Sequence, residues 1–387
     1  MKGIVFIVLL VCLVGCKSTQ QVNTPSIQIL NDTAFPDYGL FPVETEQQVF
    51  ELDDEAKAFV NRIVAPIYDP IDRMETLIER IFDRSELNLL YMGNANTTAA
   101  ETFHNRAANC LSLSIMAYSM AKQAGFSVRF QDIDIPEYWT RRDGFSLLNG
   151  HINLKIMPRP NSSVVQFIQQ GFEVDFDPQA SRNHFPKRFV GRSTILSMYY
   201  NNKGADALLA NSYTKAYSYF RAAIMTDPDF ESAYVNLGFL YRLNGKYQYA
   251  ENAYTKALEI DPDNLTAWEN LAYLYVNVGQ QERADEIMAR VEQKRRDNPF
   301  YHFILGEQEF EKENYLVALD HYRDALRLDK TRHEIFYGLA KTYYQLGDVN
   351  RSARYFKKAI QRSRTDQDQR RYQGKLDFLS RRGKTKS

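Results

Sequence analysis

The fold of the C-terminal half is decided by residues 231–262, which read ESAYVNLGFLYRLNGKYQYAENAYTKALEIDP. Large and small residues follow one another there in a fixed order: Tyr234, Leu237, Gly238, Tyr241, Ala250, Tyr254, Ala257 and Pro262. The same order recurs with a period of 34 residues, from Trp268, from His302 and from Phe336, and a less regular copy ends at Pro228. Repetition at this period predicts a solenoid of stacked two-helix units.

This pattern resembles the tetratricopeptide repeat. In that family the large residues fill the space between two helices, and the small Gly or Ala lets the helices approach closely. Asp-Pro at 227–228 and 261–262 is expected to end the second helix of its unit, because proline cannot continue a helix. The resemblance implies an all-α superhelical solenoid over 197–366, in units 197–230, 231–264, 265–298, 299–332 and 333–366. Residues 367–387 are expected to form a capping helix and a tail.

The resemblance also implies where a partner would bind, because the first helix of each repeat lines the inner face of the superhelix. The expected partner-binding groove consists of Phe239, Arg242, Tyr273, Asn277, Phe300, Phe303, Phe310, Tyr337, Lys341 and Tyr344. An aromatic concave surface with scattered polar groups suits an extended protein or peptide segment, or a partner helix. The alternative is that these aromatic residues pack against the capping helix or the upstream domain.

The region in front of the repeats, residues 51–195, has a different character. Apolar spacing predicts helices over 52–65 and 71–82, and a buried helix over 107–125 that ends at Gly125. The segments FSVRFQDI, HINLKI and FEVDFD then alternate apolar and polar residues as strands do. Helices followed by an antiparallel sheet predict an α+β domain.

Three kinds of side chain in this domain could form a nucleophilic site. Cys110 begins the predicted buried helix, where the helix dipole favours a thiolate. His151 opens one strand, and Asp175 and Asp177 lie on one face of another. A thiol, an imidazole that takes its proton and a carboxylate that orients the imidazole form a catalytic triad. The alternative is that Cys110 is a small apolar packing residue, as buried cysteines often are.

The local sequences NCLSLSIMAYSMAKQAGFSVRF, GHINLKI and FEVDFDP resemble the transglutaminase-like cysteine fold of the papain-related superfamily. The resemblance implies a catalytic role for Cys110 as nucleophile, for His151 as base and for one of the two aspartates. Asp175 fits the family's spacing slightly better, whereas Asp177-Pro178 mimics its Asp-Pro-Thr ending. Asn153 replaces the family's usual tryptophan, which puts the acyl-donor pocket of a true transglutaminase in doubt.

Other residues near these strands have a weaker claim to the site. Trp139 lies between two predicted strands, where it either covers a cleft or fills a core. His104 precedes Cys110 by six residues, and packing or surface roles suit it better. No histidine has metal-ligand spacing, and the sequence contains no phosphate loop or dinucleotide fingerprint, so we expect neither a metal nor a cofactor.

Residues 1–15 are typical of a lipoprotein signal peptide, with a basic start and an apolar run of eleven residues that is too short to span a bilayer. The run ends in Leu-Val-Gly-Cys, which resembles the bacterial lipobox and implies lipidation of Cys16. Lys17 after it, rather than Asp, implies the outer membrane, with the protein facing the periplasm. An ordinary secretory signal or an uncleaved stub of a membrane helix is the alternative. Residues 16–50 are expected to form a polar tether.

Composition and cysteine usage narrow the function. The 48 basic and 48 acidic side chains balance, which argues against broad binding to nucleic acid. Cys12 would leave with the signal and Cys16 would carry lipid, so Cys110 is the single thiol expected in the folded part. Two functions follow: an envelope enzyme that acts on an amide bond as a peptidase, amidase or acyl transferase, and a non-enzymatic membrane-anchored scaffold. The oligomeric state is not specified by the sequence.

Overall fold

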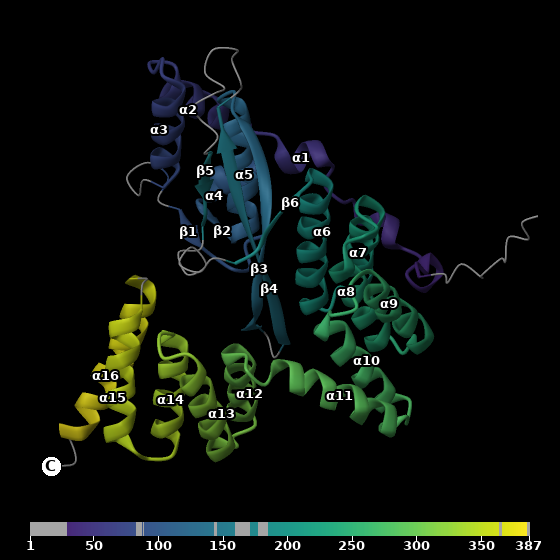
Figure 1. Cartoon of the computed structure of the whole chain (residues 1–387), viewed down its shortest axis with the longest axis vertical. Helices are drawn as coiled ribbons and strands as arrows, with labels where there is room; N and C mark the ends of the chain where they lie inside the picture. The colour runs from purple at the N-terminus through teal and green to yellow at the C-terminus, as the bar shows by residue number, and fades with distance from the viewer. Residues whose placement is uncertain are drawn as a thin grey trace, which may run out of the picture.

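The computed structural model describes residues 29–82, 87, 89–142, 145–158, 171–176, 185–363 and 366–384 (Figure 1). The expected signal peptide, Cys16 and the first part of the expected tether lie outside the described residues, and so does Asp177. Within the described ranges, no helix is both long enough and apolar enough to cross a membrane.

The chain enters the described part as an arm that packs on the repeats. This arm contains the short helices η1 (Asp32–Ala34), η2 (Tyr38–Leu40) and α1 (Glu46–Phe50). The ring of Phe35 stacks on that of Tyr217 with centroids 4.6 Å apart, and the Tyr217 hydroxyl donates to Asp32 Oδ1 at 2.7 Å. The expectation of a polar tether up to residue 50 is therefore wrong for residues 29–50. Phe35 is fixed to the repeats by aromatic contacts, and Phe50 packs on Tyr118 and Phe130 of the front domain.

The front domain begins with α2 (Asp54–Val64), α3 (Pro70–Phe82), α4 (Ala99–Asn105) and α5 (Cys110–Gln123). The central helix α5 starts at Asn109, whose side chain accepts from the backbone N–H of Ser112 and so caps the first turn. Two residues past its end, Gly125 has a φ of +91° that residues with a side chain rarely adopt. Tyr118 of α5 stacks on Phe130 with centroids 4.5 Å apart, which fixes the helix to the sheet.

The main sheet has the strand order β5–β4–β3–β6, and all its pairs are antiparallel. Its strands are β3 (Ser127–Arg142), β4 (Phe145–Met157), β5 (Phe172–Val174) and β6 (Lys187–Val190). A second, two-stranded parallel sheet pairs β1 (Leu90–Tyr91) with β2 (Ala107–Ala108). The segment 133–150, which we expected to connect two strands, instead extends both into a long hairpin with an irregularity between Ile133 and Tyr138.

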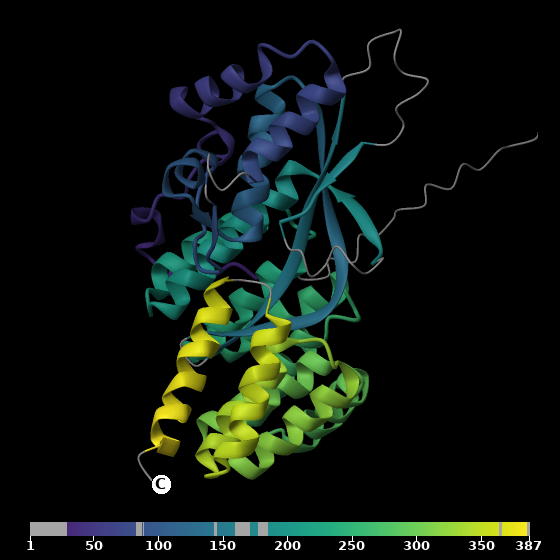
Figure 2. The ribbon, with the colours of Figure 1, turned by 90° about the vertical axis from the view of Figure 1, so that its left-hand side faces the viewer.

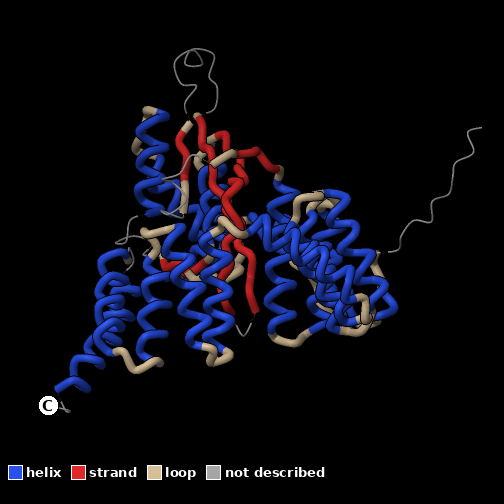
Figure 3. Tube along the Cα trace, turned by 60° about the horizontal axis from the view of Figure 1, so that its bottom comes forward, coloured by secondary structure: helices blue, strands red, loops and turns tan. Residues whose placement is uncertain are grey.

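The rest of the chain is an array of antiparallel helix pairs that curves beneath the front domain (Figures 1 and 3). Its helices are α6 (Arg192–Leu209), α7 (Tyr213–Thr226), α8 (Glu231–Leu243), α9 (Tyr247–Ile260), α10 (Leu265–Asn277), α11 (Gln281–Arg295), α12 (Pro299–Glu311), α13 (Tyr315–Leu328), α14 (His333–Gln345), α15 (Val349–Arg362) and α16 (Asp366–Lys384). The hairpin of β3 and β4 reaches down into the concave side of this array, where β3 contacts α12.

The small residue of the repeat pattern sets the closeness of each pair. A Cβ atom on Gly238 of α8 would lie 2.6 Å from the ring of Tyr254 on α9, and Gly306 meets Tyr322 in the same way at 2.7 Å. Real Cβ atoms do not come that close to a ring, so the helices pack at this distance because the position has no side chain. At the end of the array, α16 inserts the fully buried Tyr372 against α14, where its hydroxyl meets His333 Nδ1 at 2.9 Å.

Candidate functional site

Cys110 lies at the first position of α5 and is partly exposed. The residues before it form β2, and Asn109 caps the helix, so the position of the thiol is set by a strand, a cap and a buried helix. The backbone N–H groups of a first helical turn and the helix dipole stabilise negative charge there. A thiolate at this position would be stabilised by the first turn of the helix.

His151 and Asp175 form a pair at adjoining strands. His151 lies on β4 and is only 2% exposed, and its Nε2 atom is 3.0 Å from Oδ2 of Asp175, directly after β5. The next residues of β4, Ile152 and Leu154, belong to the hydrophobic core. A carboxylate at Nε2 favours the tautomer with its proton there, which leaves Nδ1 as the basic atom.

Cys110 and His151 line one cavity of about 510 Å³. Its walls come from the front domain and from the first helices of the repeats, including Phe239 and Arg242 of α8 and Tyr273 of α10. This is the size of an ordinary ligand site. The cavity is therefore shared by the two parts of the molecule.

A polar network beside Cys110 joins the front domain to the first repeat. The Asn109 amide donates to Asn96, and the Asn96 amide donates to Asp206 on α6, at distances of 2.5 Å each. Arg142 at the end of β3 pairs with the same carboxylate. All four residues line the cavity. The cap of the thiol helix is thus tied to both the hairpin and the solenoid.

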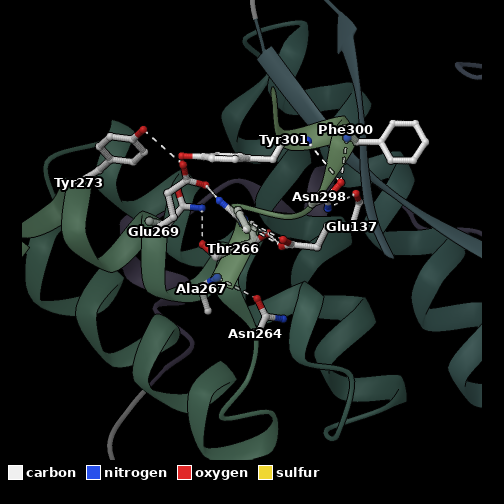
Figure 4. Close-up of polar contacts among 11 residues, drawn as sticks. Glu137, Asn264, Thr266, Ala267, Glu269, Tyr273, Asn298, Phe300 and Tyr301 are labelled. Atoms are coloured by element: carbon white, nitrogen blue, oxygen red, sulfur yellow. Dashed lines mark hydrogen bonds and ion pairs between the residues drawn. The ribbon is translucent and has the colours of Figure 1, made fainter. Parts of the chain in front are cut away.

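A second junction fixes the hairpin to the third repeat unit (Figure 4). Arg295 of α11 is 2% exposed and donates to both carboxylate oxygens of Glu137 on β3, at 2.7 and 2.8 Å, and to Glu269 of α10 at 2.9 Å. Asn298 donates to the backbone oxygen of Glu137 at 2.9 Å. Burial alone would lower the pKa of Arg295, but the two carboxylates raise it, so the guanidinium stays charged.

The expected groove residues divide into two groups. Phe239, Arg242 and Tyr273 line the cavity, as a binding role requires, while Asn277 is exposed at the end of α10. The remaining residues take part in packing within the later repeats, as their contacts show: Phe300 beneath Arg332, Phe303 beside Tyr322, Phe310 beneath Lys341, Lys341 paired with Glu307, Tyr337 stacked on Tyr372, and Tyr344 against Phe356 and its neighbours. Of these contacts, the stacking of Tyr337 on Tyr372 of α16 is of the kind that the packing alternative expects, and the contacts of Phe300, Phe303, Phe310 and Lys341 lie within the repeats.

Two residues that the sequence left ambiguous have definite places. Trp139 is buried and lines the cavity. The Cζ atom of Arg295 lies over its ring, 4.9 Å from the centroid of the Trp139 ring. His104 pairs with Asp53 and is not among the residues that line the cavity. No group of His, Cys, Asp and Glu side chains in the described part of the chain is arranged to hold a metal ion.

These observations define the class of protein. It is a solenoid of helix pairs with an α+β domain on its concave side. The tetratricopeptide repeat family matches residues 232–264, 253–286 and 303–368, so the helix pairs in these ranges are tetratricopeptide repeats. A search of curated proteins finds no match.

Solved structures with similar repeats include YrrB, described as a tetratricopeptide repeat protein with an unusual peptide-binding site, at 18% identity over 46% of this chain and 92% of that one, with a TM-score of 0.26. PilF of Pseudomonas aeruginosa is 16% identical over 49% of this chain and 94% of its own, with a TM-score of 0.29. The Cut9–Hcn1 assembly of the APC/C is 19% identical, but this chain spans only 37% of the matched chain, with a TM-score of 0.29.

The sequence did not predict either junction of the hairpin. Arg142 pairs with a residue 64 positions away, and Arg295 with one 158 positions away. A buried arginine within a helix that is otherwise strongly polar has no local signature, because its partner is fixed only by the tertiary fold. The one local signal is the charged Glu137 next to Pro136, between the apolar residues Ile135 and Trp139.

Proposed function

We propose that this chain is a membrane-anchored envelope protein whose repeats hold a protein segment against a cysteine site that acts on an amide bond. The observation that carries the proposal is the cavity in which Cys110 and His151 meet the first helices of the repeats. Tetratricopeptide repeats generally bind protein or peptide partners, and Phe239 and Tyr273 supply an aromatic wall for one here.

In this proposal Cys110 Sγ attacks the carbonyl carbon, and its proton passes to Nδ1 of His151, because Nε2 is engaged by Asp175. The C–N bond breaks as the imidazolium gives the proton to the leaving amine, which produces a thioester. Water then attacks the thioester and restores the thiol. The backbone N–H of Cys110 helps to bind the oxyanion. Hydrolysis is preferred over acyl transfer, because bacterial members of the resembled superfamily are often peptidases.

Lipidation of Cys16 at the outer membrane, with the folded part in the periplasm, completes the proposal. It is supported by the lipobox-like residues 13–16 and by Lys17 after them. Metabolic labelling with an alkyne fatty acid should mark the wild-type chain and leave Cys16→Ser unmarked. Equal labelling of the two chains would exclude this anchor.

The thiol site is tested by the rate at which a fluorescent iodoacetamide labels the full chain at neutral pH. Cys110→Ala should remove the label. His151→Ala should slow it about tenfold or more, because general-base activation of the thiol is lost. His104→Ala is the matched control, because that ring pairs with Asp53 away from the cavity and should leave the rate unchanged. A rate unaffected by His151→Ala would exclude an activated thiol.

A non-enzymatic scaffold is the second candidate, and the buried junction of Arg295 with Glu137 and Glu269 favours it, because it fixes the two domains as one binding body. This function requires the cavity wall and not the thiol. If the protein is a scaffold, Cys110→Ser should leave its cellular function unchanged, while Tyr273→Glu in the repeat wall should abolish that function. If the protein is an enzyme, Cys110→Ser should impair its cellular function as strongly as Tyr273→Glu does.

A further inference from the structure

The charges that line the shared cavity are compensated with one exception. Each carboxylate of the lining is paired with an arginine: Asp132 with Arg188, Asp206 with Arg142, and Glu269 with Arg295. Arg242 also lines the cavity, but among the described residues no carboxylate lies within ion-pair distance of it. Burying a cation without a counter-ion has an unfavourable free energy. The position of Arg242 in a cavity therefore points to an anionic group on a bound ligand.

The surroundings of Arg242 hold its guanidinium in place. Its central carbon lies 5.0 Å from the ring centroid of Phe239 and 5.9 Å from that of Tyr273. Its Nε atom is buried and has no hydrogen-bond partner. Aromatic faces attract a guanidinium without using its N–H donors, and its polar contact with Tyr254 is to a neutral hydroxyl, so the guanidinium still lacks an anionic partner.

Uncharged polar residues lie on the same wall as Arg242. Asn236 and Asn270 lie on α8 and α10 and line the cavity, and Gln308 of α12 does so as well. The Asn236 amide donates to Asn201 at 2.8 Å, and the Asn270 amide donates to the backbone oxygen of Thr266 at 2.9 Å, which leaves their side-chain oxygens as acceptors. Amide oxygens accept from the N–H groups of a peptide backbone, whereas Arg242 can bind only an acceptor.

We propose that Arg242 is a specificity residue that binds a carboxylate of the segment held in the cavity, so that the preferred ligand is an acidic peptide. The planar fork of a guanidinium matches a carboxylate with two parallel hydrogen bonds, which a neutral amide cannot accept in the same way. The carboxylate is either an Asp or Glu side chain or the C-terminus of the ligand. The role of this ligand as a substrate rests on the proposed function, but its binding does not.

Cys110 serves as the reporter in the test, because it lines the same cavity. The probes are iodoacetyl-oligoglycines of increasing length, each made with a free C-terminal carboxylate, with a C-terminal amide, with an added aspartyl amide and with an added asparaginyl amide. The full chain is treated with each probe, and the rate of alkylation of Cys110 is measured. At the spacer length that reaches Arg242, we expect an acidic probe to react about tenfold faster than its neutral partner, as one charge-assisted hydrogen-bonded pair provides.

The variants separate the role of Arg242 from damage to the fold. Arg242→Gln should abolish the preference for acidic probes, and Arg242→Lys should retain part of it, while both react with plain iodoacetamide at the wild-type rate. If only the probe with a free C-terminus reacts faster than its amide, Arg242 binds a terminal carboxylate. If the aspartyl probe reacts faster than the asparaginyl probe, Arg242 binds an acidic side chain. Equal rates for acidic and neutral probes at every length, or a preference that survives Arg242→Gln, would overturn the proposal. Because these comparisons do not involve His151, they stand even if the thiol is not activated.

Discussion

Asp175 determines which nitrogen of His151 can accept a proton. Replacing it by asparagine puts an amide N–H opposite Nε2, which then has to accept, so that Nδ1 carries the proton and can no longer take one from Cys110. We expect Asp175→Asn to slow alkylation of Cys110 at neutral pH about as much as His151→Ala does. Asp134→Asn, at an exposed position on β3, is the control and should leave the alkylation rate unchanged.

Asp32 carries the pH dependence of the arm. Burial raises its pKa, but hydrogen bonds from Tyr217 and Arg221 outweigh burial, and the net pKa is below the usual value. A carboxyl with a lowered pKa in the folded state stabilises the fold above its unfolded pKa, and this contribution is lost as the pH falls through its folded pKa.

We expect Asp32→Asn to lower the free energy of unfolding by about 1 kcal/mol at neutral pH, a modest value because the side chain is largely exposed. The difference from wild type should shrink as the pH is lowered below the usual range of an aspartate. Urea unfolding at several pH values measures it. A difference that does not change with pH would mean that the ionised carboxylate is not what holds the arm.

At the scale of the elements, the repeat spacing depends on Gly238. Gly238→Ala would place a methyl group against the ring of Tyr254, so we expect a loss of about 1–3 kcal/mol in the free energy of unfolding. Gly374→Ala in α16 is the matched control, because a Cβ there meets nothing within 4 Å and alanine is the better helix former. Thermal unfolding of both variants checks this, and equal melting temperatures would contradict the close packing.

The elements that the sequence predicts well are those with a local cause. The helices of the repeats follow from a repeated order of large and small residues, and α5 begins and ends where Asn109 and Gly125 require. Two elements could not be predicted for physical reasons. The outer part of the hairpin contains Pro136 and polar residues and is stabilised by α11 and α12, and the arm depends on Phe35 reaching aromatic rings far along the chain. Such contacts join residues far apart in the sequence, so they are defined only by the tertiary fold.

At the scale of the whole molecule, the hairpin makes the two domains one unit. It leaves the front domain and reaches the repeats (Figure 2). It lines the cavity and is fixed at Arg142 to the first repeat and at Glu137 to the third. The two attachments hold the cavity between the sheet and the repeats at a fixed width. In the proposed function, the thiol and the aromatic wall face the same bound segment, because both line this cavity.

Glu137→Gln should loosen this junction, because it leaves the buried Arg295 with one carboxylate instead of two. We expect a loss of about 2–4 kcal/mol in the free energy of unfolding and faster hydrogen exchange in residues 134–149. Glu259→Gln, which breaks only a surface pair with Lys256, should change neither. Unchanged hydrogen exchange in the hairpin of Glu137→Gln would show that the junction does not hold it.

The pH profile of Cys110 alkylation by iodoacetamide tests most directly whether the cavity contains an activated thiol. An ordinary cysteine has a pKa of about 8.5, so its rate rises steeply only above neutral pH. In the wild-type chain we expect the rate to reach its plateau at lower pH, and His151→Ala to return the profile to that of an ordinary thiol. Superimposable profiles for the two chains would contradict a Cys110–His151–Asp175 site and leave the protein as a scaffold.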